Sequence, residues 1–251
     1  MIHVLSLIDG DLYKTVKFKN PNYIGDPINA IKIFNDKEVD EIVVIDIRAS
    51  KDNTPINFKK IEEMASECFM PLGYGGGIKT LEDAKQIFKI GGEKVIVNSA
   101  FVDRPQTITE IANIFGSQSM VVAIDVKKSL LGKEYCYFES GQKSSKMNPV
   151  EAAKRAEELG AGEIILTSIS LDGTRRGYDL DLIQRVSGQV GIPVVACGGA
   201  HEVPDYTKAV NAGASAVAAG SMFVYKGSVD SILINYPDQN VLISDFYSQV
   251  K

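Results

Sequence analysis

The sequence contains no tryptophan, only two histidines and only three cysteines among its 251 residues. Cys68, Cys136 and Cys197 lie far apart and form no CxxC pair, a pattern that favours a reducing cytoplasmic location over a disulfide framework. His3 falls in a strand pattern and His201 opens a helix, so we expect both to be structural or exposed. Two histidines are too few for a histidine-based metal site, and we predict no metal and no cofactor.

The sequence also lacks long apolar runs, blocks of lysine and arginine, and a basic leader before its first strand. Its formal net charge is -5, which gives no reason to expect nucleic acid as a partner. We therefore expect a protein that neither crosses a membrane nor binds nucleic acid. With 45% hydrophobic residues, the chain suits one domain over residues 1–251.

An internal repeat with an offset of 122 residues runs through the chain. Four pairs keep this spacing: Gly77 with Gly199, Ser99 with Ser221, Phe101 with Phe223, and Glu41 with Glu163. A repeat that covers both halves of a chain indicates an architecture built from two similar halves.

Short apolar strands alternate with helix-length segments along the whole chain. The eight expected strands are Ile2–Leu7, Glu41–Ile47, Met70–Tyr74, Lys94–Val97, Met120–Ile124, Glu163–Leu166, Val194–Ala196 and Ala216–Ala219. This alternation predicts an α/β fold, a (β/α)8 TIM barrel with a two-fold half-barrel internal repeat. A doubly wound open sheet is the alternative, although two equal halves close more naturally into a barrel.

Three segments outside these strands carry expectations of their own. We expect Asp11–Pro27 to be a long loop and a candidate lid, on which Lys17 and Lys19 are solvated. The imperfect alternation of Leu131–Lys146 indicates a small hairpin, and Ile232–Val250 is expected to hold a last helix.

A glycine run follows one strand in each half, at Gly75–Gly77 and at Gly198–Gly199, and a neighbouring strand ends in Asn98-Ser99 or Gly220-Ser221. Glycines let backbone N–H groups approach an anion closely, and a following helix directs its positive end at it. Alternatively, such glycines are needed only for tight turns between a strand and a helix. Two copies favour a ligand with a phosphate at each end.

Catalytic side chains of a barrel come from the carboxyl ends of its strands. Asp125 ends the fifth strand, and Ser6 occupies the equivalent position of the other half. Acid–base chemistry would suit two facing carboxylates, of which this pair supplies one. Asp46 is explained equally well as a catalytic group or as a cap for the next loop, and Asp9 is typical of a structural turn.

Motifs along nearly the whole chain resemble those of the cyclase subunit of imidazole glycerol phosphate synthase. They include Asp9-Gly10 with Lys14, Gly25-Asp26-Pro27, Gly75-Gly76-Gly77-Ile78, Asn98-Ser99-Ala100, Gly116-Ser117-Gln118, Ile124-Asp125, Thr167-Ser168-Ile169, Asp172-Gly173-Thr174 and Gly198-Gly199. The resemblance implies a heterodimer with a glutamine amidotransferase subunit, whose ammonia crosses the barrel. It further implies a phosphorylated substrate, with imidazole glycerol phosphate and aminoimidazole carboxamide ribotide as products, in histidine biosynthesis.

The resemblance also implies residue roles. Asp125 matches one of the two catalytic aspartates of the family, and the other falls on Ser6. Together with the strand-end positions Asp46 and Thr167, the expected substrate- and phosphate-binding residues are Lys14, Gly77, Asn98, Ser99, Asp172, Gly173, Gly199, Gly220 and Ser221. The implied ammonia gate consists of Glu41, Lys94 and Glu163.

The sequence departs from the family at functional positions. Ser6 is not ionised at neutral pH and cannot replace a carboxylate as general acid or base. The gate ring of the family includes an arginine upstream of the first strand that has no counterpart here, and Ser170-Leu171 stands where an Asp-Arg pair is usual.

These departures leave three functions open. The first is a working cyclase with Asp125 as base and with Asp9 or water supplying the missing acid. The second is a non-cyclising paralogue that channels ammonia to a sugar amidotransferase in surface-polysaccharide synthesis. The third is a sugar isomerase of the sister barrel family, against which Ser6 counts because that activity also uses two aspartates.

Overall fold

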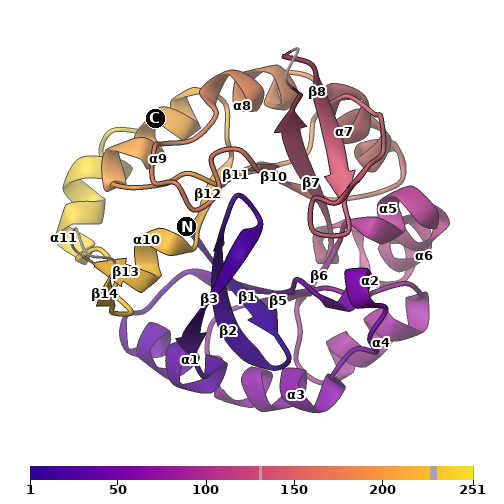
Figure 1. Ribbon diagram of the computed structural model, residues 1–251, viewed down its shortest axis with the longest axis horizontal. Helices are drawn as coiled ribbons and strands as arrows, with labels where there is room; N and C mark the ends of the chain where they lie inside the picture. The colour runs from indigo at the N-terminus through magenta and orange to yellow at the C-terminus, as the bar shows by residue number, and fades with distance from the viewer. Residues whose placement is uncertain (130–131, 227–230, 251) are drawn as a thin grey trace.

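The computed structural model describes residues 1–129, 132–226 and 231–250, and within them eight parallel strands close into a barrel (Figure 1). Around the barrel the strands follow in the order β1 (Ile2–Ile8), β4 (Glu41–Asp46), β5 (Leu72–Gly75), β6 (Lys94–Val97), β7 (Met120–Lys128), β10 (Glu163–Ser168), β11 (Val194–Cys197) and β12 (Ala216–Ala219). Pairing of β12 with β1, with Ile2 opposite Ala218, closes the ring. The expected (β/α)8 barrel is therefore confirmed.

Helices surround the strands as an outer ring, which Figure 1 shows along the barrel. The longer ones are α1 (Pro27–Asp36), α3 (Phe58–Glu67), α4 (Leu81–Lys89), α6 (Gln106–Phe115), α7 (Pro149–Glu158), α8 (Leu180–Ser187) and α9 (Val203–Asn211). The shorter ones are α2 (Ala49–Asp52), α5 (Ser99–Asp103), α10 (Ser221–Val224), α11 (Gln239–Leu242), the 3₁₀ turn η1 (Ser117–Ser119) and the π turn η2 (Ile243–Tyr247). Within the described ranges, none of the helices has the length and apolarity to cross a membrane.

Local sequence explains where these helices begin. In α7, the Asn148 side chain accepts the N–H of Glu151 at 2.9 Å and Pro149 takes the first helical position. In α4, Thr80 and Asp83 form a reciprocal capping box. Both signals are local, and sequence alone is enough to locate these helix starts.

The observed strands agree with the expected ones to within two residues, except for β7. This strand runs to Lys128 because it leaves the barrel as one edge of an antiparallel hairpin with β8 (Glu134–Phe138) and β9 (Lys143–Ser144). The expected small hairpin is thus confirmed, although Leu131 lies outside the described residues. The expected last helix is confirmed as α11 and η2, which follow the short pair β13 (Tyr225–Lys226) and β14 (Ser231–Ile232).

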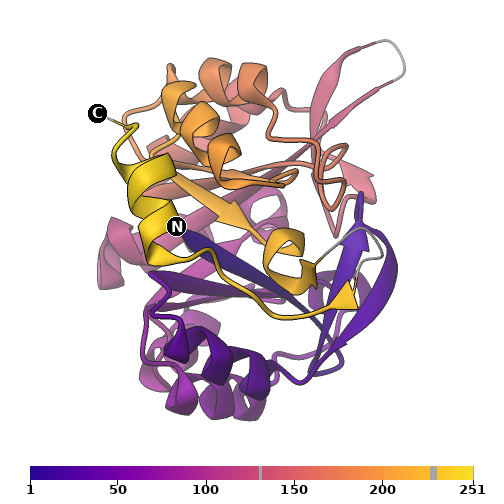
Figure 2. The same ribbon diagram turned by 90° about the vertical axis from the view of Figure 1, so that its left-hand side faces the viewer.

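The expectation of a long loop over Asp11–Pro27 was wrong. The segment forms a hairpin of β2 (Asp11–Val16) and β3 (Lys19–Gly25), and β2 pairs with the end of β1 (Figure 2). Its tight turn uses positive φ angles at Lys17 and Phe18, +54° and +61°, without a glycine. The usual turn signal is therefore missing from the sequence. Lys17 is exposed, as expected of a solvated lysine.

Successive strand residues point alternately into the barrel and out toward the helices. The inward side chains of the lower layers form a closed apolar cluster consisting of Ile2, Val43, Ile96, Val121, Ile165, Val195 and Ala218. Their neighbours Ile42 and Val44 belong instead to the larger core between strands and helices. Each inward position therefore lies in one of a few layers stacked along the barrel axis.

His3 is structural, as expected. Its ring is 1% exposed and stacks on Phe223 with a centroid distance of 3.8 Å, while Phe34 and Tyr236 lie beside it. Neither ring nitrogen has a hydrogen-bond partner among the described residues. Burial, and to a lesser extent the charges of the Met1 amino group and Lys14, hold the pKa of His3 well below its usual value.

This environment predicts a pH effect on stability. His3 stays neutral in the folded protein, so its contribution is fully present above about pH 6.5 and is lost as the pH falls below that value, because the unfolded chain then binds the proton. The variant His3→Leu has no such proton to bind. Its unfolding free energy should therefore fall less steeply with decreasing pH than that of the native chain, by up to about 1.4 kcal/mol per pH unit. Urea unfolding between about pH 5 and pH 7 measures it, with His201→Gln on the exposed His201 as control. An unchanged slope in His3→Leu would contradict the assignment.

Candidate active site at the carboxyl ends of the strands

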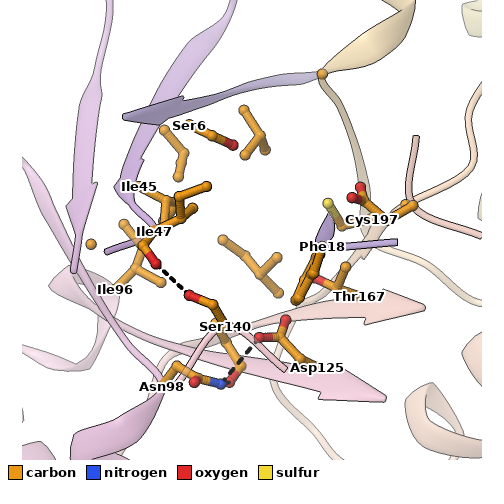
Figure 3. A pocket seen from close by; sticks show the side chains of 18 of the residues that line it. Ser6, Phe18, Ile45, Ile47, Ile96, Asn98, Asp125, Ser140, Thr167 and Cys197 are labelled. Atoms are coloured by element: carbon orange, nitrogen blue, oxygen red, sulfur yellow. Dashed lines mark hydrogen bonds between the residues drawn. The ribbon is translucent and has the colours of Figure 1, made fainter. Parts of the chain in front are cut away.

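A pocket of about 170 Å³ opens at the carboxyl ends of the barrel strands and is lined from both halves of the chain (Figure 3). Its deepest walls are the apolar side chains of Val43, Ile96 and Ile165, which belong to the inner cluster of the barrel. Above them lies a more polar layer of inward strand-end residues: Ser6, Asn98, Asp125, Thr167 and Cys197. The pocket therefore joins an apolar floor to a polar rim.

Asp125 is the acid of this layer. The Asn98 amide donates to its Oδ2 at 3.4 Å and also to the carbonyl oxygens of Ala123 at 3.0 Å and Tyr137 at 3.2 Å, which fixes the amide beside the carboxyl group. Burial raises the pKa of Asp125 to about 7, the charge of Asp172 adds to the rise, and a hydrogen bond from Thr167 opposes it. Asp125 can therefore exchange a proton near neutral pH.

Ser6 faces Asp125 across the pocket, as Figure 3 shows. The strand order explains this placement, because β1 and β7 are separated by four steps in either direction around the barrel. The repeat-equivalent positions are thus opposite each other, as the sequence indicated. Of this pair only Asp125 can ionise near neutral pH.

The two glycine corners also lie opposite each other. The first comprises Gly77, Asn98 and Ser99 after β5 and β6, and the second comprises Gly199, Gly220 and Ser221 after β11 and β12. β5 and β11 are four strands apart, as are β6 and β12. All six residues line the pocket, and so do Asp172 and Gly173 beside the second corner.

Glycine is required at these turns for two reasons. Gly77 and Gly199 adopt positive φ angles of +75° and +112°, which disfavour other residues. A side chain at Gly199 would also overlap the carbonyl of Gly177. The close approach of backbone to backbone leaves main-chain N–H groups rather than side chains at the corner, which suits an anionic ligand.

Lys14 reaches the second corner from the β2–β3 hairpin. Its side chain is 8% exposed and its Nζ donates to the carbonyl oxygen of Val4 at 2.6 Å. Burial lowers the pKa of Lys14, and the nearby charge of Asp172 opposes the change. Burial likewise raises the pKa of Asp172 to about 6, with the charge of Lys14 opposing. Both groups are thus biased toward their neutral forms.

Asp46 lines the pocket rim, but its carboxylate is engaged with the backbone. Its Oδ1 accepts the N–H groups of Arg48 at 2.9 Å and Ala49 at 3.0 Å. Burial raises the pKa of Asp46, and these two hydrogen bonds oppose the rise. The geometry favours the capping explanation over the catalytic one.

Asp9 lies at the outer rim and is not among the described pocket-lining residues. Its side chain is 79% exposed and pairs with Arg48 at 3.4 Å. The positive φ of Asp9, +53°, fits the expected structural turn. Asp9 is therefore poorly placed to act as the second acid in place of Ser6.

At the opposite end of the barrel, three charged residues meet below the apolar cluster. Lys94 Nζ lies 2.9 Å from Glu41 Oε1 and 3.1 Å from Glu163 Oε2. The family resemblance had grouped these three residues, and the structure brings them into contact. We call them the charged ring. Burial disfavours the Lys94 charge, but the two carboxylates outweigh it and raise its pKa; burial raises the pKa of Glu41 against the pull of Lys94.

Comparison with known proteins identifies the family. Residues 1–230 match the family model described as histidine biosynthesis protein. A Pseudomonas aeruginosa protein, provisionally named imidazole glycerol phosphate synthase subunit hisF2, is 49% identical over 96% of this chain and 97% of its own. Imidazole glycerol phosphate synthase subunits HisF of Petrotoga mobilis and Pyrococcus furiosus are each 42% identical over 90% of this chain, covering 90% and 89% of their own lengths.

The chain belongs to the cyclase-subunit family of imidazole glycerol phosphate synthase. The resemblance found in the sequence is thereby confirmed at the level of the family. The roles of individual residues in this family member remain predictions, which the geometry now makes more specific.

Several residues of the pocket were missed by the sequence analysis: Phe18, Ser50, Ser140 and Cys197. Ser140 comes from the turn between β8 and β9, and its hydroxyl donates to the carbonyl oxygen of Ile47, drawing this turn over the pocket (Figure 3). Phe18 lies at the tip of the other hairpin. Only Cys197 carried a signal, because it directly precedes the second glycine run.

The raised pKa of Asp125 predicts a stability change with pH. A carboxyl group whose folded pKa is about 7 and unfolded pKa is 3.8 contributes stability that is fully present below about pH 4 and lost as the pH rises through 7. The unfolding free energy of Asp125→Asn relative to the native chain should therefore increase by about 2–3 kcal/mol between about pH 5 and pH 8. Urea unfolding checks this, with Asp36→Asn on the exposed end of α1 as control. A constant difference across this range would show that Asp125 titrates normally.

The two explanations of Asp46 are separable by substitution. An asparagine can still accept both backbone N–H groups, so Asp46→Asn should leave stability nearly unchanged, whereas Asp46→Ala should lose about 1–3 kcal/mol of unfolding free energy. If Asp46 instead transferred protons, Asp46→Asn would keep its stability but lose about 10²–10⁴-fold in turnover. Denaturant unfolding and turnover of the same two variants distinguish these outcomes.

Proposed function

We propose that this chain is the barrel subunit of a glutamine-dependent synthase, in which ammonia from a glutamine amidotransferase subunit reacts with a bis-phosphorylated substrate. The products are imidazole glycerol phosphate and aminoimidazole carboxamide ribotide. The observation that carries the proposal is the stacking of three features along one barrel axis: the charged ring, the apolar interior and the pocket with two opposed corners.

The path for ammonia follows from the alternation of side chains. Glu41, Lys94 and Glu163 each stand two residues before Val43, Ile96 and Ile165, respectively, so each ring member points inward one layer below a pocket floor residue. Apolar walls disfavour ammonium but not neutral ammonia. The charged ring would therefore lie at the entrance, where a partner subunit would dock.

The substrate would span the pocket. Its two phosphates would bind the opposed glycine corners, and the amine of Lys14 would add a hydrogen-bond donor at the second one. The reacting atoms would then lie between Ser6 and Asp125. With a pKa near 7, Asp125 is suited to accept a proton at neutral pH, and Asn98 and Thr167 hold its orientation.

Ser6 supports a second candidate function. With one ionisable group where the family has two facing aspartates, the barrel keeps its corners and its ring but loses half of its acid–base pair. A subunit that passes ammonia to a separate sugar amidotransferase, as in surface-polysaccharide synthesis, needs the ring and the apolar path but not the second carboxylate.

Ammonia-dependent turnover of the bis-phosphoribosyl substrate by the purified chain decides between these candidates. A cyclase should turn the substrate over, and Asp125→Asn should lower the rate by about 10²–10⁴-fold. A subunit that only delivers ammonia should show little turnover, and Ser6→Asp should increase it.

Ser6→Ala is the matched control, because it changes the same position without adding a carboxylate. Robust native turnover with no further gain in Ser6→Asp would rule out the delivery function as the explanation of Ser6. Binding of the substrate without turnover in any variant would rule out the cyclase.

A further inference from the structure

The amine of Lys14 has an unusual set of neighbours for a lysine. It is almost fully buried, and its hydrogen bond within the described residues goes to a main-chain carbonyl, that of Val4, at 2.6 Å. Within residues 1–129, 132–226 and 231–250, no carboxylate lies within ion-pairing distance of it. A buried ammonium without an adjacent carboxylate is costly, which shifts the balance of this lysine toward the neutral amine.

A neutral lysine amine is a nucleophile. Lysines in desolvated pockets attack carbonyl carbons to form imines, because the unprotonated amine has a free lone pair. The burial that lowers the pKa of Lys14 acts in this direction. Lys17, three residues away at the exposed hairpin turn, has no such environment.

The position of Lys14 also fits a particular kind of electrophile. Its Nζ lies directly against Gly220, so closely that a side chain at that residue would overlap it. Gly220 and Ser221 form part of the second glycine corner, which lines the same pocket. A carbonyl group a few bonds away from a phosphate held in this corner would therefore come within reach of the amine.

A proton donor stands nearby. Asp172 lines the pocket and interacts electrostatically with Lys14, and its pKa of about 6 lets it both give and take a proton near neutral pH. Imine formation needs such a group, because the carbonyl oxygen must leave as water.

We propose that Lys14 captures the carbonyl carbon of a small phosphorylated ketose as an imine. The lone pair of Nζ adds to the carbonyl carbon and gives a carbinolamine. The C–O bond then breaks as Asp172 donates a proton to the oxygen, and Nζ loses a proton as the C=N bond forms, so that amine and carbonyl yield imine and one water. The inference rests on the proposed function only in using one of its phosphate corners, and it requires neither ammonia nor a partner subunit.

Reductive trapping tests this proposal directly. The full chain is incubated with dihydroxyacetone phosphate and sodium cyanoborohydride, and intact mass is measured, followed by peptide mapping. The expected result is one adduct, equal in mass to the ligand less one oxygen atom, on Lys14. Inorganic phosphate should suppress the adduct by competing for the corner, and unphosphorylated dihydroxyacetone should give little.

Two variants make the result specific. Lys14→Arg keeps a long side chain with N–H donors but cannot form an imine and should lose the adduct, whereas Lys17→Arg on the same hairpin should keep it. Equal thermal unfolding temperatures of both variants show that loss of the adduct is not loss of the fold. If Lys14→Arg is unstable, peptide mapping of the native chain decides instead. Labelling of other lysines in place of Lys14 would overturn the proposal, and so would the absence of labelling.

The outcome is separable from that of the proposed function. An adduct on Lys14 in a chain without cyclase turnover would support imine formation and contradict only the cyclase function. Ammonia-dependent turnover in a chain that forms no adduct would contradict the imine alone.

Discussion

Closure of the parallel sheet by the pairing of β12 with β1 is the constraint on which the rest of the structure depends. Once eight strands form a ring, the alternation of side chains directs every second residue to the axis. On β10, for example, Glu163, Ile165 and Thr167 are successive inward positions in the charged ring, the apolar layer and the polar layer. Strands β1 and β7 add Ser6 and Asp125 to the polar layer. An open sheet would spread these residues along a surface, and neither a path through the interior nor a pocket with opposed corners would exist.

Burial also shapes the site, because it shifts the pKa values of the buried pocket groups Asp125, Asp172 and Lys14 toward their neutral forms. Asp125 and Asp172 gain affinity for protons, with pKa values of about 7 and about 6, while burial lowers the pKa of Lys14. In the charged ring burial also raises the pKa of Glu41, but at Lys94 the neighbouring carboxylates outweigh burial. There, Glu41 and Glu163 surround Lys94 and keep it charged, which suits an entrance rather than a reaction chamber.

The two-fold repeat makes the asymmetry of the pocket visible. Each half contributes a glycine corner, and the halves are related by four strand steps, so residues 6 and 125 occupy equivalent positions. Here Ser6 faces Asp125, and of this pair only Asp125 can transfer a proton near neutral pH. The hairpins that line the pocket also differ: the first half contributes Phe18 of the β2–β3 hairpin, and the second contributes Ser140 of the β8–β9 turn.

The sequence by itself determined the strands, the repeat and the glycine corners, because these depend on local periodicity and on backbone freedom that single residues encode. The three members of the charged ring were grouped only by the family resemblance, because they meet from three different strands. It did not reveal the β2–β3 hairpin, since the turn at Lys17 and Phe18 reaches positive φ without glycine and is held by pairing with β1. Only the tertiary structure decided that Asp46 binds the backbone of its own loop and that the amine of Lys14 lies buried against Gly220. The contact of Asp46 is local, but strand-end position alone fits both a cap and a catalytic group, whereas the contact of Lys14 joins segments whose approach no local pattern specifies.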